Sequence, residues 1–239
     1  MIPKIIHYCW FGNSPLPQLA LKCIESWKKH CPDYKIKEWN ESNFNINFNA
    51  YTKEAYKAGK WAFVSDVARL YAVYTEGGIY LDIDVELIKS LNFFLDNSMF
   101  IGFESDELLA TGLGFGAEKE FYIIKEMLDI YDDISFINSD GEINNTPCSV
   151  YNTEFMKKEG FIINNTKQTI NGITVFPTEY LCPKNWKNDE MIITLNTYAI
   201  HHFLGSWFGD KEIKHLELVK KFQSVKKRFL RVKFEKRQK

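Results

Sequence analysis

The sequence predicts one α/β domain, because signals for strands and helices alternate along the chain. Apolar and period-two stretches typical of strands are separated by stretches with helical periodicity. A chain of 239 residues can bury a sizeable core and falls within the size of a single domain. No internal repeat or low-complexity linker divides it. This order of elements does not fit an all-α or an all-β fold.

The first buried strand is expected at residues 2–9, which are mostly apolar. Pro15 and Pro17 open a helix that ends near residue 30, and residues 34–39 alternate as a second strand. The Asn-rich residues 41–50 are expected to be a loop. The later elements are strands at 99–104, 112–117 and 198–202, helices at 119–131 and 149–159, a β-rich stretch at 161–177 with an Asn171-Gly172 hairpin turn, and a basic helix from about residue 210.

Residues 61–76 form the clearest helix of the sequence, because apolar side chains recur on one face with helical spacing. The stripe consists of Phe63, Val67, Leu70, Tyr71 and Tyr74. Gly77 and Gly78 end the helix as a left-handed C-terminal cap would.

Residues 79–86 alternate with period two, which predicts a strand with two different faces. One face would carry Ile79, Leu81, Ile83 and Val85, and the other Tyr80, Asp82, Asp84 and Glu86. Hard divalent cations prefer oxygen ligands and commonly bridge carboxylates to phosphate oxygens. A solvated strand face is the alternative, but the apolar partners demand burial on one side. The pattern therefore favours a metal site at Asp82 and Asp84.

Asp66 and Arg69 lie three residues apart on one flank of the preceding helix, so their side chains are neighbours. They could form an ion pair on the helix surface. They could instead face a binding site, where Asp66 accepts hydrogen bonds from sugar hydroxyls and Arg69 presents its planar guanidinium to sugar or phosphate. The pair alone does not decide between these interpretations.

A further polar group follows near residue 200. His201 and His202 are adjacent, and strand alternation lets only one of them face a site; histidine is a common metal ligand. Ser206 and the indole N–H of Trp207 follow a glycine and can donate hydrogen bonds to phosphate oxygens. We interpret this segment as a second contribution to the Asp82 and Asp84 site.

The five cysteines are odd in number and dispersed, without CxxC spacing. This pattern indicates free thiols in a reducing compartment rather than a disulfide framework or a zinc site. The N-terminus has no features of a signal peptide, and no apolar run reaches the roughly 18 residues of a membrane span. We expect a cytoplasmic location, at the inner face of the cell membrane.

The net charge of the whole chain is −1, but its C-terminal segment is strongly basic. Residues 220–239 contain ten Lys or Arg and one Glu, a net charge of +9. We expect a catalytic unit at residues 1–209 and a basic amphipathic helix or tail at 210–239. The tail could pack on the domain as a solvated helix, or bind an anionic membrane surface, where each basic residue contributes about 1 kcal/mol. Nucleic acid is disfavoured as a partner, because the rest of the chain is acidic.

The motifs together, in their order along residues 2–207, resemble glycosyltransferase family 32. They are IPKIIH with Trp10, then SDVAR, GGIYLDID and HHFLGSW. That family contains capsular and O-antigen sugar transferases and Och-type mannosyltransferases, and is related to the glucosyltransferase domains of clostridial toxins. The resemblance implies a GT-A fold, a nucleotide-sugar donor, Mn²⁺ or Mg²⁺, and retention of the anomeric configuration.

The resemblance also assigns expected roles to individual residues. Trp10 would stack on the base, Asp66 and Arg69 would hold the sugar, and Tyr80 would line the donor pocket. Asp82 and Asp84, with His201 or His202, would bind the metal, and Ser206 and Trp207 would close over the diphosphate.

The expected reaction is hexose transfer from UDP-galactose or UDP-glucose to a glycan acceptor, free or lipid-linked, in capsular or surface polysaccharide synthesis. GDP-mannose is the alternative donor. A metal-dependent phosphohydrolase and a non-catalytic membrane-bound scaffold are the alternatives from other classes.

Overall fold

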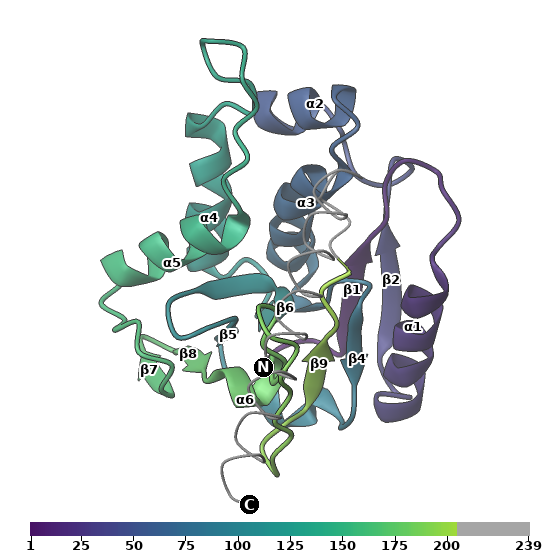
Figure 1. The fold of residues 1–239 in the computed structure, drawn as a ribbon, viewed down its shortest axis with the longest axis vertical. Coiled ribbons are helices and arrows are strands. Elements are labelled where there is room, and N and C mark those ends of the chain that lie inside the picture. Colours follow the sequence, from purple (N-terminus) through teal and green to yellow (C-terminus); the bar gives the residue numbers. More distant parts are fainter. Residues whose placement is uncertain (205–239) are drawn as a thin grey trace, which may run out of the picture.

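A computed structural model describes residues 1–204, and residues 205–239 are not described. A seven-stranded mixed sheet in the order β2-β1-β3-β6-β5-β8-β7 forms the centre of the fold (Figure 1). Three neighbouring pairs are parallel (β1 with β2, β1 with β3, β5 with β8), and three are antiparallel (β3 with β6, β5 with β6, β7 with β8). A separate two-stranded sheet joins β4 and β9 in antiparallel fashion.

The elements alternate along the chain. The strands are β1 (Ile5–Cys9), β2 (Lys35–Trp39), β3 (Gly78–Tyr80), β4 (Val85–Leu87), β5 (Met99–Phe103), β6 (Leu109–Ala117), β7 (Gln168–Ile170), β8 (Ile173–Phe176) and β9 (Ala199–His201). The helices are α1 (Gln18–His30), α2 (Ala50–Lys57), α3 (Trp61–Glu76), α4 (Tyr122–Asp133), α5 (Cys148–Lys158) and α6 (Thr178–Leu181), with a 3₁₀ turn η1 (Leu91–Phe94). Within residues 1–204, no helix has both the length and the apolar content needed to cross a membrane.

Two apolar clusters fill the core, and the alternation of strand side chains separates them. Tyr80 points into the cluster that contains the apolar stripe of α3 together with side chains of α2, α4 and α5. Its neighbours Ile79 and Leu81 point into the other cluster, with side chains of α1, β4 and η1. The site at the end of β3 is therefore held between two packed layers.

The α/β fold predicted from the sequence is confirmed, and the helix at residues 61–76 has the expected bounds. The hairpin turn at Asn171 and Gly172 is confirmed as well, because both residues have positive φ (49° and 81°) between β7 and β8. The expected loop at residues 41–50 is followed by α2, a helix that the sequence patterns did not predict. The expected basic helix and tail at 210–239 lie outside the described residues.

The prediction of one continuous strand over residues 79–86 was wrong. The chain leaves the large sheet after Tyr80, turns at Ile83 and Asp84, and enters β4 in the small sheet. The alternating burial survives, because Ile79, Leu81, Ile83 and Val85 all join one apolar cluster. A period-two pattern determines which side chains are buried. It does not require the first and second halves of the segment to pair with the same strands.

Candidate functional site

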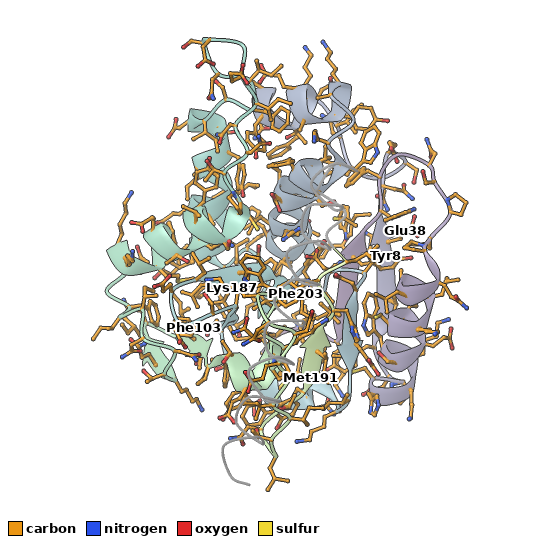
Figure 2. The ribbon with its side chains drawn as sticks, viewed as in Figure 1. Tyr8, Glu38, Phe103, Lys187, Met191 and Phe203 are labelled. Carbon is orange, nitrogen blue, oxygen red and sulfur yellow. The ribbon has the colours of Figure 1, made fainter. Side chains whose placement is uncertain are left out.

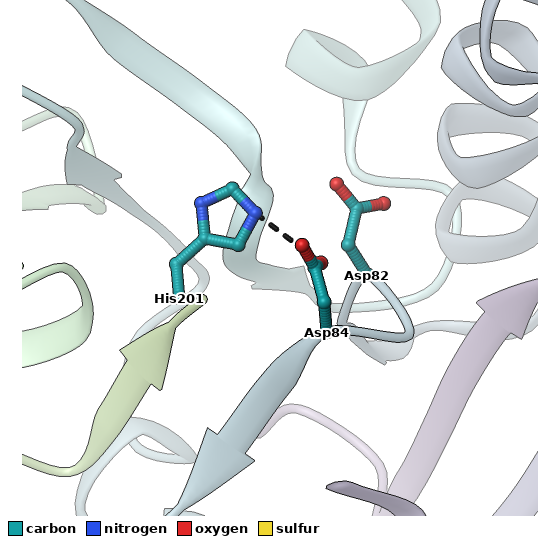
Figure 3. Close-up of side chains that lie close together, drawn as sticks. All are labelled: Asp82, Asp84 and His201. Atoms are coloured by element: carbon teal, nitrogen blue, oxygen red, sulfur yellow. Dashed lines mark ion pairs between the residues drawn. The ribbon is translucent and has the colours of Figure 1, made fainter. Parts of the chain in front are cut away.

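The turn between β3 and β4 brings three potential metal ligands together. Asp82 and Asp84 lie on this turn, and His201 ends β9, which pairs with β4. One ligand atom from each of the three side chains lies within 4.8 Å of the others. Figure 3 shows both carboxylates and the imidazole directed to the same space. The group therefore depends on the turn and on the β4–β9 pairing, and not on one strand face.

Asp84 is the most firmly held of the three. Its Oδ1 lies 3.3 Å from Nε2 of His201, and its Oδ2 accepts a hydrogen bond of 2.6 Å from the backbone N–H of Leu204. Burial alone would raise the pKa of this carboxyl, but the His201 ring and the Leu204 amide outweigh it and lower the pKa to about 2. Asp84 is thus a carboxylate at neutral pH, as a metal ligand must be.

His201 and His202 have different surroundings. His201 is in the carboxylate group, where burial lowers its pKa and the neighbouring Asp84 carboxylate raises it by more. The His202 ring instead lies 2.9 Å from Oε2 of Glu86, and its backbone N–H donates to the carbonyl of Asp84. The geometry places His201 with Asp82 and Asp84, while His202 fastens β9 to β4.

The carboxylate of Asp82 is held by two donors on its Oδ1 atom. The hydroxyl of Tyr80 donates to Oδ1 at 2.8 Å, and Nη2 of Arg69 lies 3.2 Å from the same oxygen. The Arg69 guanidinium also lies over the Tyr80 ring, 4.9 Å from its centroid. These contacts connect the Asp82 turn to helix α3 and fix the orientation of its carboxylate.

Asp66 and Arg69 form a buried ion pair, with Nη2 3.0 Å from Oδ1. Only 8% of Asp66 and 4% of Arg69 is exposed, so the surface-pair interpretation was wrong. Burial raises the pKa of Asp66 to about 6 despite the neighbouring guanidinium. Arg69 contacts both Asp66 and Asp82, and Asp84 faces His201. Three carboxylates therefore face two basic side chains in this group.

Four residues near this group were not named individually by the sequence interpretation, although it expected residues 104–117 and 142–148 on the acceptor side. Nη1 of Arg69 lies 3.4 Å from Thr111 Oγ1 and 3.6 Å from Cys148 Sγ, and Asn152 donates to Thr111 at 3.3 Å. The fourth is Glu104, which follows β5. Burial raises the pKa of its carboxyl, although the nearby His201 charge acts in the opposite direction. No local motif marks these residues, because the fold alone brings β5, β6 and the start of α5 beside α3.

Trp10 follows β1 and lies at the same edge of the sheet as the Asp82 turn, because β1 and β3 are parallel neighbours. It is half-buried against the apolar cluster of α1, and its indole N–H donates to the Ser14 carbonyl at 2.5 Å. Ser206 and Trp207, the expected contacts to the diphosphate, lie outside the described residues.

Comparison with known proteins shows which family part of this arrangement resembles. Residues 17–101, which include α3 and the Asp82 turn, match the family described as a glycosyltransferase sugar-binding region containing a DXD motif. The chain is similar to DXD glycosyltransferases. An uncharacterized glycosyltransferase of Acanthamoeba polyphaga mimivirus is 29% identical to this chain over 240 residues. The match covers 93% of this chain and 88% of that protein.

Two further similarities are more partial. Inositol phosphoceramide mannosyltransferase 1 of Schizosaccharomyces pombe is 24% identical over 128 residues, which cover 46% of this chain and 39% of that protein. The solved structure of PaToxG glycosyltransferase is similar with a TM-score of 0.54 and 20% identity, over 66% of this chain and 69% of that one. The expected GT-A type of fold is confirmed, as is the resemblance to DXD glycosyltransferases.

Proposed function

We propose that the chain transfers a hexose from a UDP-sugar, UDP-galactose or UDP-glucose, to a glycan acceptor with retention of configuration. The observation that carries this proposal is the convergence of Asp82, Asp84 and His201 beside the buried Asp66–Arg69 pair. The acceptor belongs to capsular or surface polysaccharide synthesis.

The residues present fit a divalent cation. Two carboxylates supply hard oxygen ligands, which favour Mn²⁺ or Mg²⁺, and the Arg69 charge alone does not balance the carboxylates around it. Asp82, Asp84 and His201 would hold the ion, and His201 would give up its proton as the ion binds. His202 is kept in place by Glu86. When bound, the ion supplies Lewis-acid stabilisation of the diphosphate leaving group.

The remaining residues of the site bind and orient the donor. Arg69 presents charged N–H groups next to Asp66, and together they recognise sugar hydroxyls or phosphate oxygens. Tyr80 keeps the Asp82 carboxylate in place through its hydroxyl. Trp10 stacks on the base, which fits its place after the first strand, since ligands of open α/β sheets gather at the carboxyl ends of strands.

We assign residues 1–209 to the catalytic unit and 210–239 to a basic attachment segment. Ser206 and Trp207 close over the diphosphate. The basic segment holds the enzyme at an anionic membrane surface on the cytoplasmic side, beside a lipid-linked acceptor. The charge of residues 220–239 supports this assignment.

GDP-mannose is a second candidate donor. The similarity to an inositol phosphoceramide mannosyltransferase supports it, and it requires the same metal site with a different base contact.

A donor panel tests the proposal. The melting temperature is measured with UDP-galactose, UDP-glucose, UDP-N-acetylglucosamine and GDP-mannose, each with Mn²⁺ and with EDTA, and donor hydrolysis is followed in parallel. We expect stabilisation and slow hydrolysis with one UDP-hexose, in the presence of metal only. Stabilisation by GDP-mannose alone would select the second candidate. Hydrolysis of simple phosphate esters without any response to nucleotide sugars would contradict both and indicate a phosphohydrolase.

A further inference from the structure

Strand β6 departs from regular pairing directly beside the Asp82 turn. The register between β5 and β6 shifts at Ile101 and Gly102, so that residues 111–114 bulge out of the ladder. Bulges of this kind often re-aim groups next to active sites. Here the bulge carries Gly112 to the turn, where its carbonyl accepts a hydrogen bond of 3.0 Å from the Asp82 N–H.

The carboxylate of Asp82 occupies the space where a side chain at residue 112 would lie. A Cβ atom on Gly112 would overlap Oδ2 of Asp82, well inside the 3.0 Å that real Cβ atoms keep from other atoms. It would also lie 3.2 Å from the Asp82 Cγ and 3.3 Å from Nη1 of Arg69. The φ angle of Gly112 is outside the left-handed region, so a left-handed backbone does not account for the glycine. The requirement for glycine at this position is therefore steric.

The Asp82 carboxylate cannot move aside without losing other contacts. Its Oδ1 accepts from the Tyr80 hydroxyl and faces the Arg69 guanidinium, while its Oδ2 lies against Gly112. One oxygen is thus held by two donors, and the other lies beside a residue that has no side chain. A shift of about 1 Å in a group that binds a reacting partner can cost on the order of a hundredfold in rate.

We propose that Gly112 is a positioning residue of the metal site: the absence of a side chain there, on the β6 bulge, sets the orientation in which Asp82 reaches the ion. This inference rests on the proposed role of Asp82 as a metal ligand. It assigns a function to the bulge of β6, which carries no sequence motif and lies outside the matched residues 17–101.

The test is the Mn²⁺ affinity of Gly112→Ala, measured by electron paramagnetic resonance of free Mn²⁺ without any donor. We expect at least a tenfold loss of affinity with the circular dichroism spectrum unchanged. Gly102→Ala is the matched control, because it lies at the same register shift and its Cβ would meet the apolar Leu181 side chain at 3.0 Å. This control is expected to change Mn²⁺ affinity less than twofold.

A double-mutant cycle separates positioning of Asp82 from a general disturbance of β6. In an Asp82→Asn background, adding Gly112→Ala is expected to change Mn²⁺ affinity less than twofold. The inference is overturned if Gly112→Ala causes the same large loss of Mn²⁺ affinity with Asp82 and with Asn at residue 82. It is also overturned if Gly112→Ala alone causes no loss. Neither result contradicts the proposed metal site. A wild-type chain without Mn²⁺ affinity overturns the metal site and the inference together.

The folding of the variants provides a second readout. If Gly112→Ala alone does not fold, the double variant with Asp82→Ala removes the overlapping carboxylate and is expected to fold. Failure of this double variant to fold would show that residue 112 meets an obstacle other than Asp82, and would overturn the inference.

Discussion

The substitution Asp84→Asn removes one charge from the site while preserving its shape. The carboxylate lies 3.3 Å from the His201 ring and accepts a hydrogen bond of 2.6 Å from the Leu204 amide. Hydrogen bonds to charged groups contribute about 1.5–3 kcal/mol each. The fall in the Asp84 pKa from 3.8 to about 2 gives a similar figure, about 2 kcal/mol at 1.4 kcal/mol per pKa unit. We therefore expect Asp84→Asn to lose about 2 kcal/mol of stability without metal.

The sign of this contribution fixes its pH range. Because the pKa of Asp84 is lower in the folded protein, its contribution is present above about pH 4 and is lost as the pH falls toward 2. The stability difference between wild type and Asp84→Asn should therefore be constant near neutral pH and shrink in acid. Urea unfolding at a series of pH values measures it.

Metal dependence is the second readout for the same variant. A ligand that binds only the folded state raises stability by about 2.7 kcal/mol at a hundred times its dissociation constant, so Mn²⁺ should raise the melting temperature of wild type but not of Asp84→Asn. Glu86→Gln is the matched control, since it is also a carboxylate-to-amide change but contacts His202. Near-native Mn²⁺ stabilisation and turnover in Asp84→Asn would refute the role of this carboxylate.

Three further predictions concern the base, the tail and a buried histidine. Trp10→Ala should weaken UDP binding by about 1–3 kcal/mol, the scale of base–aromatic stacking. An unchanged UDP affinity in calorimetry would mean that Trp10 only packs against the domain and does not contact the base. Deleting residues 220–239 should leave donor hydrolysis unchanged and abolish co-sedimentation with anionic vesicles. A full-length chain that does not sediment with these vesicles would contradict membrane attachment by the basic segment. His7 accepts from the Trp39 indole and donates to the Gly77 carbonyl, and burial lowers its pKa to about 4. Since this pKa is below the unfolded value of 6.5, the free energy of unfolding should fall by about 2 kcal/mol from pH 7 to pH 5. Urea unfolding measures this fall. An equal fall in the His7→Gln variant would exclude His7 as the cause.

The sequence was sufficient for features that depend on neighbouring residues. The stripe of α3 and the hairpin at Asn171-Gly172 follow from local periodicity and turn chemistry, and both were predicted. The pairing of Asp82 with Asp84 was also predicted, although for the wrong reason. Their spacing suggested one strand face, whereas a turn between two sheets brings them together.

Features that depend on long-range packing could not be predicted. His201 reaches Asp84 because β9 pairs with β4 from more than a hundred residues away along the chain, and no local pattern distinguishes it from His202. Thr111 and Cys148 contact Arg69 only because the β6 bulge and the start of α5 meet beside α3. A surface or buried location for the Asp66–Arg69 pair was undecidable for the same reason, since burial depends on the strands that cover the helix.

We propose that Asp82, Asp84 and His201 hold the metal ion that the donor diphosphate binds. Pulsed electron paramagnetic resonance of Mn²⁺ bound to the protein with UDP tests it most directly, because it detects imidazole nitrogen in the coordination sphere. We predict one histidine nitrogen coupling that is lost in His201→Ala and kept in His202→Ala. A coupling that persists in His201→Ala, or Mn²⁺ bound through UDP without any histidine nitrogen, would contradict the assignment.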